Sequence, residues 1–169
     1  MTTLLIESIT VGTTVVLSKR AQNRVIKASL NSVALQWDRK FLRLHFLPSA
    51  GARYGYKARA RATEQKKLRL AALGKVARGG RVDLVHSGLT EQTVVRPHFV
   101  RATPTRAIVP IITPSYIIAR SRTPQRINKD REIKAIIPRE ETALQKTGDA
   151  TLEKQSRFEA DNARYKSKA

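Results

Sequence analysis

The strongest structural signal in this chain is residues 18–44, which read SKRAQNRVIKASLNSVALQWDRKFLRL. Large apolar side chains recur in this segment at steps of three or four, at Ile26, Leu30, Val33, Trp37, Phe41 and Leu44. That spacing places them on one face of an α-helix. Ser18 precedes the helix and is a residue type preferred at the N-cap. The segment therefore predicts a long amphipathic helix that is anchored in the core by Trp37 and Phe41.

Sequences with strand character flank this helix. Residues 3–17 end in a β-branched run, so they predict one or two strands. Residues 93–101 and 105–120 are also β-rich, but prolines interrupt both segments. Because proline cannot donate a hydrogen bond to a β-ladder, these segments predict edge strands or a long β-hairpin. We expect the helix to pack on a small antiparallel sheet.

Two further helices complete the predicted α+β fold. Residues 58–73 consist largely of helix-forming residues with many bases, and Gly74 can end that helix. Pro138 suits the first position of a C-terminal helix, since two acids follow it in the first turn. The sparse apolar face of this last helix is Leu144, Leu152 and Phe158. We expect a single domain over residues 1–160 and a disordered basic tail over residues 161–169.

Positive charge dominates most of the 169-residue chain, which has a formal net charge of +20. Residues 53–81 hold ten Lys or Arg and one acid, whereas residues 132–169 hold eight bases and seven acids. This imbalance favours a body that faces a polyanion or an acidic protein, and a C-terminal part that packs on protein. The absence of cysteine excludes disulfides and thiolate metal sites.

The basic segment is the main candidate for binding, and its candidate residues are Arg53, Lys57, Arg59, Arg61, Lys66, Lys67 and Arg69. Tyr54 and Tyr56 at its start could stack on bases while the cations hold phosphates. Alternatively, the segment could line a channel for DNA, dock an acidic protein, or form a solvated helix face. On a helix the charges would wrap around the axis, and this arrangement favours sequence-independent binding.

Signals for catalysis are weak. The three histidines, His45, His86 and His98, do not stand at metal-ligand spacings. The sequence has no nucleophile motif, phosphate loop or dinucleotide fingerprint. We therefore predict that the protein is not an enzyme and has no catalytic residue, bound metal or cofactor. The N-terminal residues lack the features of a signal peptide, and no apolar run is long enough for a membrane helix. We expect synthesis in the cytoplasm and no membrane partner.

Several short segments, in order along the chain, resemble the small neck or tail-completion proteins of long-tailed bacteriophages. The matching segments are Trp37 with His45-Phe46, Tyr54-Gly55-Tyr56-Lys57-Ala58-Arg59, Lys66-Lys67, Leu84-Val85-His86-Ser87-Gly88 and Ile136-Ile137-Pro138-Arg139-Glu140-Glu141. Together these segments lie within residues 13–158. The resemblance implies a short strand and an amphipathic helix, then a Lys-rich helix, a β-hairpin and a C-terminal helix.

The same resemblance implies a structural virion protein of the head–tail interface. Such a protein forms a homo-oligomeric ring around the DNA channel and joins the capsid connector to the tail. Its partners would be other copies of itself, the connector with adaptor or stopper proteins, tail-terminator or tail proteins, and packaged DNA through non-specific contact. The charge also fits a nucleic-acid-binding protein of ribosomal or architectural type, or a basic adaptor for an acidic protein. A defined ring on purification favours the neck protein, whereas co-purified RNA favours the nucleic-acid binder.

Overall fold

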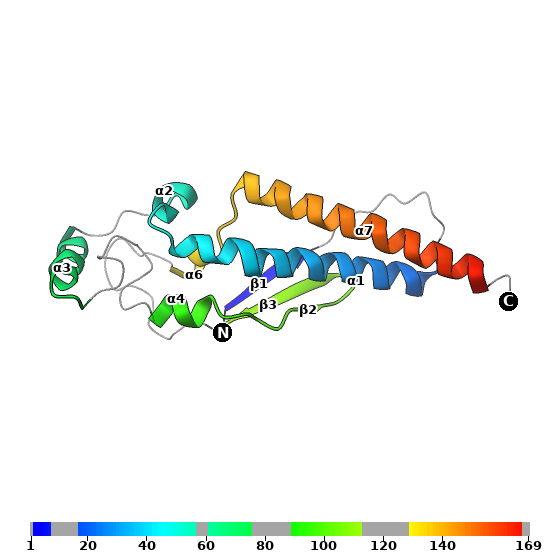
Figure 1. Ribbon diagram of the computed structural model, residues 1–169, viewed down its shortest axis with the longest axis horizontal. Helices are drawn as coiled ribbons and strands as arrows, with labels where there is room; N and C mark the ends of the chain where they lie inside the picture. The colour runs from blue at the N-terminus through cyan, green and yellow to red at the C-terminus, as the bar shows by residue number, and fades with distance from the viewer. Residues whose placement is uncertain (1, 8–16, 57–60, 76–88, 113–128, 167–169) are drawn as a thin grey trace. The chain divides into compact units, whose positions relative to one another are not determined.

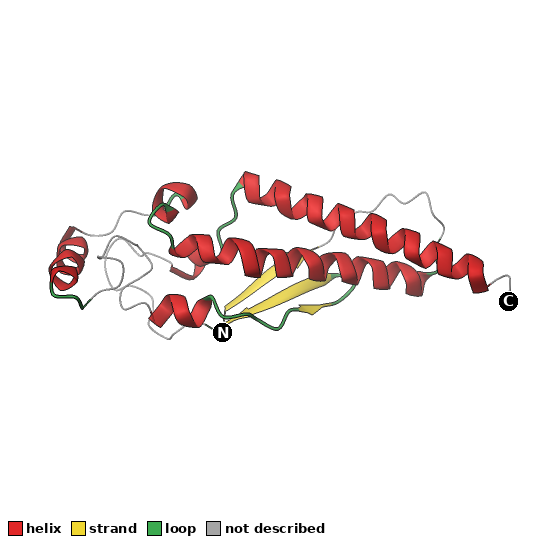
Figure 2. Cartoon of the chain, in the orientation of Figure 1, coloured by secondary structure: helices red, strands yellow, loops and turns green. Residues whose placement is uncertain are grey.

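The computed structural model describes residues 2–7, 17–56, 61–75, 89–112 and 129–166 (Figure 1). Helices dominate this part of the chain, and a small sheet accompanies them (Figure 2). The predicted α+β class is therefore confirmed. The contacts divide the chain into two compact units, where the sequence predicts one domain over residues 1–160. Unit 1 comprises Met1–Thr2, Asp38–His98 and Ile111–Pro138, and unit 2 comprises Thr3–Trp37, Phe99–Pro110 and Arg139–Ala169.

Unit 2 is built around two long helices, α1 (Lys19–Gln36) and α7 (Pro138–Lys166). They run antiparallel and side by side (Figure 1), and three side-chain contacts connect them. Arg24 pairs with Glu159, the Ser29 hydroxyl donates to the Gly148 carbonyl at 2.9 Å, and the Thr151 hydroxyl donates to Ser32 at 3.0 Å. Near the start of α1, the apolar side chains of Leu17, Ala21 and Val25 pack against Leu152 of α7.

The start of α1 is the predicted one. The Ser18 hydroxyl accepts a hydrogen bond from the Ala21 backbone N–H at 3.3 Å, which satisfies one of the unpaired donors of the first turn. Arg20, Arg24 and Lys27 are exposed along the helix.

The helix continues past Gln36 with a changed geometry. A π-helical turn, Trp37–Phe41, follows α1, and a 3-10 helix, Leu42–Phe46, follows that turn. Leu30, Val33, Trp37 and Phe41 are buried as predicted. Ile26, the first residue of the predicted face, is only half-buried, and Val25 is buried beside it instead. Beyond the π turn the predicted face fails, because Leu42 is fully buried and Leu44 is only half-buried. The wider turn shifts the angular phase of every residue that follows it.

The sheet has the strand order β1-β3-β2, formed by β1 (Thr2–Glu7), β3 (Arg106–Ile111) and β2 (Arg101–Ala102). β2 and β3 form an antiparallel hairpin in which Arg101 lies opposite Ile108 and Ala102 lies opposite Ala107. Ala107, Val109 and Ile111 are fully buried and their neighbours are more exposed, so one face of β3 lies in the core. α1 packs against β2, as expected for a helix on a small sheet.

The predicted strands are only partly correct. Residues 89–94 form a short helix, α4 (Leu89–Val94), so the predicted strand at residues 93–101 is reduced to β2. β3 contains Pro110 but is the central strand, whereas the prolines predict an edge. Pro110 is tolerated because it lies beyond the last residue pair with β2, so its missing N–H removes no bond from that ladder. The segments 8–16 and 113–120 of the predicted strands lie outside the described residues.

The final helix differs from its prediction in two respects. It begins at Pro138 as predicted, but it continues to Lys166, so the expected disorder from residue 161 is wrong up to that point. Its buried positions step by four: Glu140, Leu144, Gly148, Leu152 and Ser156. Phe158 stands two residues beyond this ridge and is therefore 59% exposed instead of packing with Leu144 and Leu152.

Unit 1 consists of shorter elements. Its 3-10 helix, Leu42–Phe46, contacts α2 (Ala50–Tyr54) and α6 (Lys129–Ile133). α3 (Arg61–Ala72) is the described part of the predicted basic helix. The buried apolar side chains of this unit include Leu42, Phe46, Ala50, Val94 and Ile133.

Candidate interaction surface

The predicted basic segment lies on α2 and α3, within unit 1. Arg53 is exposed at the end of α2, and Arg61, Lys66 and Arg69 are exposed on α3. Lys57 and Arg59 fall outside the described residues. Four of the seven predicted residues therefore present their charge to solvent in the described part of the chain.

Lys67 is the exception, because its side chain is buried. It shares the inner side of α3 with the half-buried residues Leu70 and Ala71, one turn further along. A lysine can occupy such a position because its aliphatic stem packs like an apolar side chain. The prediction that Lys67 contributes to an exposed basic surface is thus wrong, and Lys66 and Arg69 carry the outward charge of this turn.

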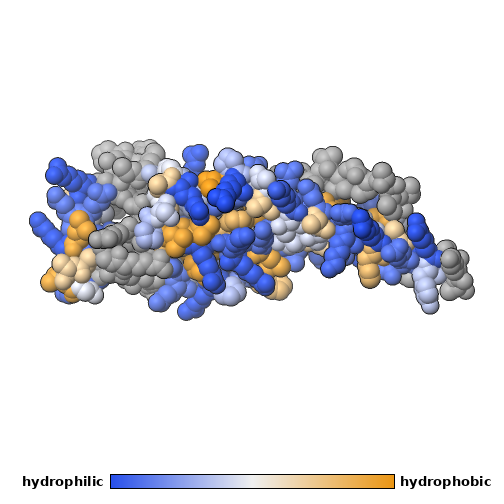
Figure 3. All heavy atoms as spheres, turned by 45° about the horizontal axis from the view of Figure 1, so that its top comes forward, coloured by the Kyte–Doolittle hydropathy of each residue, from blue (hydrophilic) through white to orange (hydrophobic). Residues whose placement is uncertain are grey.

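The exposed side of α3 is not purely polar. Leu68 is 56% exposed and Leu73 is 66% exposed. Figure 3 shows hydrophilic and hydrophobic side chains next to one another at the end of the view where α3 lies. We call this mixed surface, formed by Arg61, Lys66, Leu68, Arg69 and Leu73, the α3 surface. A surface of cations with apolar side chains between them suits a protein partner with acidic and apolar groups.

α3 ends as the sequence predicts. Gly74 has a φ of +67°, and its N–H bonds to the Ala71 carbonyl while the Lys75 N–H bonds to the Leu70 carbonyl, both at 2.9 Å. These two bonds form a Schellman motif, which satisfies carbonyls that the helix end would leave unpaired. The left-handed conformation at Gly74 therefore fixes where the basic helix stops.

The two tyrosines of the basic segment are engaged within the protein. The ring of Tyr54 stacks on His45 with 3.9 Å between centroids and an interplanar angle of 12°. His45 Nδ1 lies 2.5 Å from the Tyr56 hydroxyl oxygen, so the hydroxyl can donate to the neutral ring. Both tyrosines are half-buried. They hold α2 against the 3-10 helix, which differs from the base-stacking role that the sequence suggests.

The charge state of His45 is set by its surroundings. Burial lowers the pKa of His45 to about 4, a hydrogen bond to the backbone of Glu132 opposes this effect, and the charge of Arg53 adds to the lowering. The ring is therefore neutral near pH 7. A neutral, fully buried imidazole stacked on Tyr54 is a structural support for α2 and for the basic segment that follows it.

A second buried polar pair joins Asp38 to His98. Asp38 Oδ1 lies 2.5 Å from His98 Nδ1, and Asp38 Oδ2 accepts the His98 backbone N–H at 3.2 Å. The two side chains are 3% and 4% exposed, so the pair is closed to solvent and serves to fix the chain that leads into β2. The sequence offers one signal for this contact: Asp38 is a lone acid beside Trp37 in an otherwise apolar and basic helical pattern.

Neither histidine belongs to a metal-binding group. Among the residues that the structure describes, no set of three or more His, Asp and Glu side chains could hold a metal ion. His45 and His98 have separate partners, and His86 lies outside the described ranges. In the same part of the chain, no helix is both long enough and apolar enough to cross a membrane.

Comparison of the chain with models of known protein families, with curated proteins and with solved structures gives no match. The α3 surface thus rests on its own chemistry. It offers cations and two exposed leucines on a helix with a fixed C-terminal end, and it is suited to binding and assembly.

Proposed function

We propose that this protein is a structural component of the head–tail interface of a long-tailed bacteriophage. In this proposal copies of the chain form a ring around the DNA channel and join the capsid connector to the tail. Its site of action is the neck of the virion. The α3 surface faces a neighbouring protein or packaged DNA, and contact with DNA is independent of sequence.

The observation that carries the proposal is the order of the elements. The resemblance in sequence implies a long helix, a basic helix, a β-hairpin and a C-terminal helix. The described chain has α1, α3, the β2–β3 hairpin and α7 in that order. α7 also begins at Pro138 with Glu140 and Glu141 in its first turn, as the resemblance implies. This order supports the proposal, since Lys66-Lys67 lies on α3 and Pro138-Arg139-Glu140-Glu141 opens α7. The segments Lys57-Ala58-Arg59 and 84–88 lie outside the described residues.

Physical features of the chain support assembly. Unit 2 exposes two aromatic side chains on α7, Phe158 at 59% and Tyr165 at 78%. These residues are seven apart and therefore lie on the same side of the helix. Exposed apolar groups on two separate units favour burial against other chains. A ring subunit needs two different contact surfaces, because each copy meets one neighbour on either side.

The charge supports the same proposal. A net charge of +20 on 169 residues makes an isolated chain repel itself, and a polyanion or acidic partners relieve that repulsion. The partners in the proposal are the connector with its adaptor or stopper proteins on one side and the tail-terminator or tail proteins on the other.

The test is the state of assembly of the purified protein. Its mass would be measured in solution by light scattering across a range of concentrations, and its particles would be imaged by negative-stain electron microscopy, alone and with the capsid connector. We expect closed rings, either alone or on the connector. A chain that stays monomeric at high concentration and binds neither connector nor tail would overturn the proposal. Co-purification with RNA that is lost in high salt would instead favour the ribosomal or architectural nucleic-acid binder.

A further inference from the structure

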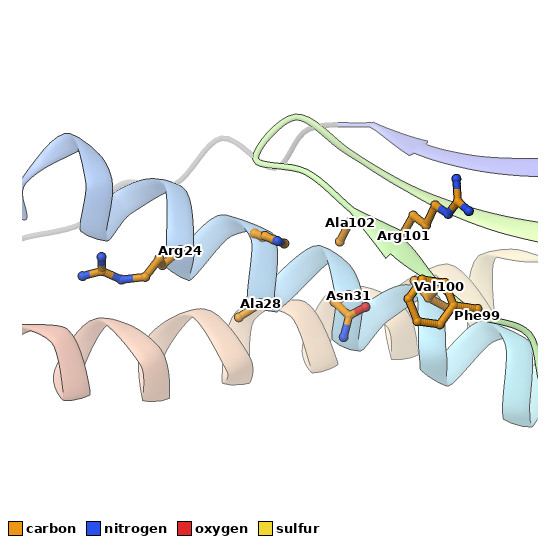
Figure 4. Close-up of a pocket in the computed structure, with 8 residues that line it drawn as sticks. Arg24, Ala28, Asn31, Phe99, Val100, Arg101 and Ala102 are labelled. Carbon is orange, nitrogen blue, oxygen red and sulfur yellow. The ribbon is translucent and has the colours of Figure 1, made fainter.

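Unit 2 contains an open groove of about 540 Å³ between α1 and residues 99–102 (Figure 4). Arg24, Lys27 and Asn31 line it from α1, and Phe99 and Arg101 line it from the chain that enters β2. The other lining residues are small or apolar. A volume of this size suits a ligand of small-molecule dimensions.

The exposure of Phe99 has a structural cause. Thr103 donates its N–H to the Arg106 carbonyl at 2.8 Å, so in the antiparallel register the Arg101–Ile108 pair is also hydrogen-bonded. The next such pair would join Phe99 to Pro110. Pro110 has no N–H to donate, so the ladder stops at Arg101 and Phe99 stays outside it. Its side chain is 77% exposed.

Phe99 and Arg101 both line the groove, and in Figure 4 the Arg101 guanidinium extends away from the Phe99 ring. Both side chains are exposed, whereas Val100 and Ala102 between and after them are half-buried. The groove therefore presents an exposed aromatic ring and, at a separate point of the same wall, an exposed guanidinium.

Lys27 supplies a second cation from the opposite wall. Lys27 is exposed, and the structure records no ion pair for it or for Arg101 within the described ranges. Arg24 differs, because its guanidinium donates two hydrogen bonds to Glu159 at 2.7 and 2.6 Å. Asn31 is half-buried and adds an amide that can donate and accept.

We propose that this groove binds a short single-stranded segment of nucleic acid, with a base on Phe99 and phosphates on Lys27 and Arg101. An exposed aromatic ring beside cations is the combination with which proteins hold unpaired bases without reading their sequence. A duplex does not fit this description, because its bases are stacked on one another and offer no free face. The activity is separate from the head–tail role, so either can fail without the other.

The test is fluorescence anisotropy with the full-length protein and two labelled oligonucleotides of equal length, oligothymidine and its abasic counterpart. The two probes carry the same phosphates, but only the first carries bases. Phe99→Ala should weaken binding of oligothymidine about 5-fold or more and leave the abasic probe unchanged. Phe158→Ala removes another exposed ring, 59% exposed on α7, and should change neither affinity.

The cations are tested by the pair Lys27→Ala and Arg101→Ala. This double variant should weaken both probes and reduce the salt slope of binding by about 1.4. Lys146→Ala with Lys154→Ala removes the same charge from exposed positions of α7 and serves as the matched control. Circular dichroism checks that every variant is folded, and Phe99→Leu keeps an apolar side chain without the ring.

Three outcomes would overturn the proposal. In the first, Phe99→Ala binds oligothymidine as tightly as the parent protein. In the second, it loses the same factor on both probes, so that no base is involved. In the third, polyglutamate displaces oligothymidine as well as an unlabelled oligonucleotide of equal charge does, and the groove then belongs to an acidic peptide.

Discussion

Trp37 links the sequence pattern to the packing at the scale of single residues. Its side chain is fully buried at the point where α1 passes into the π turn. We expect Trp37→Ala to lower the free energy of unfolding by about 3–5 kcal/mol, because the protein loses both the transfer energy of the ring and the packing around it. Urea denaturation and the melting temperature measure the loss.

The control for this variant is Phe158→Ala, since Phe158 is 59% exposed. It should change stability by no more than about 0.5 kcal/mol. An unchanged melting temperature for Trp37→Ala would show that the ring does not anchor the core.

The lowered pKa of His45 predicts that the stability of the protein depends on pH. Burial lowers its pKa to about 4 in the folded chain, whereas the unfolded chain keeps the ordinary value near 6.5. The unfolded state therefore binds a proton first as the pH falls. Stability contributed by neutral His45 is complete above about pH 6.5 and is lost progressively down to about pH 4.

The variant His45→Gln removes this titration, so its melting temperature should fall less than that of the parent protein between pH 7 and pH 5. Comparison of the two proteins cancels the titration of groups that they share. Parallel curves for parent and variant would contradict a lowered pKa at His45. The variant should also be less stable at pH 7, because it loses the stack on Tyr54.

Single-residue predictions succeed where helical spacing alone decides burial. Spacing is enough to bury Leu30, Val33 and Trp37. It fails at Ile26, where Val25 is buried instead, and at Leu44, which follows a π turn that carries no clear sequence signal. The contact of His98 with Asp38 joins residues that are 60 positions apart, so local pattern cannot reveal it. The same holds for Lys67, whose burial depends on its surroundings and not on its charge.

At the scale of elements, α7 shows what a hydrophobic pattern misses. Its buried ridge contains Gly148 and Ser156, which do not register as apolar. The carbonyl of Gly148 accepts a hydrogen bond from the Ser29 hydroxyl of α1. In the sequence Gly148 reads as a weak point in the helix, and in the structure it is a contact between two helices.

Capping residues predict the ends of the helices more reliably than the hydrophobic pattern predicts their buried faces. Ser18, Gly74 and Pro138 each mark a helix end as the sequence predicts, because each satisfies or removes a backbone group that the end would leave unpaired. The short strand β2 could not be predicted in the same way. Its length depends on which residue of β3 faces Phe99, and therefore on the register of the hairpin.

Gly74 allows a direct test of how α3 ends. Its φ of +67° is costly for residues with a Cβ, and an added Cβ would meet no atom within 4 Å. Gly74→Ala should therefore destabilise the last turn of α3 by about 1–2 kcal/mol through the backbone alone. Hydrogen exchange at the amides of Gly74 and Lys75 should become faster by a matching factor. Gly74→Asn should show a smaller change, because asparagine adopts this conformation more readily; equal exchange in the alanine variant and the parent would exclude the Schellman ending.

At the scale of the whole molecule, charge and exposed apolar groups decide the behaviour of the chain. Two ion pairs, Arg24–Glu159 and Arg157–Glu153, engage acids of α7, so part of the acidic charge is neutralised within unit 2. α3 has one acid, Glu64, among its bases. The uneven charge seen in the sequence is thus retained on the α3 surface, whereas composition cannot say which cations face outward.

The exposed cations of α3 can be tested for a role in assembly by charge reversal. Reversal of Lys66 and Lys67 together would place an acid at a buried position, so a fold defect could mimic a defect in assembly. Lys66→Glu with Arg69→Glu changes two exposed side chains one turn apart and avoids that ambiguity. If the proposed head–tail role holds, we expect this variant to fold normally and to reduce the yield of joined, infectious particles at least about 10-fold, as a loss of about 1.4 kcal/mol in binding of the partner would do to its affinity.

The matched control reverses Lys146 and Lys154 on α7, which changes the net charge by the same amount at exposed positions. If net charge alone governs joining, both variants should fail equally. If the α3 surface docks on an acidic partner, only the first should fail, and its defect relative to the parent should become smaller as the salt concentration rises, because salt screens both the attraction of the parent's cations and the repulsion of the introduced glutamates. Under the proposed head–tail role, normal particle yields from the α3 variant in a complementation assay would show that α3 is a solvated face and that assembly depends on other surfaces.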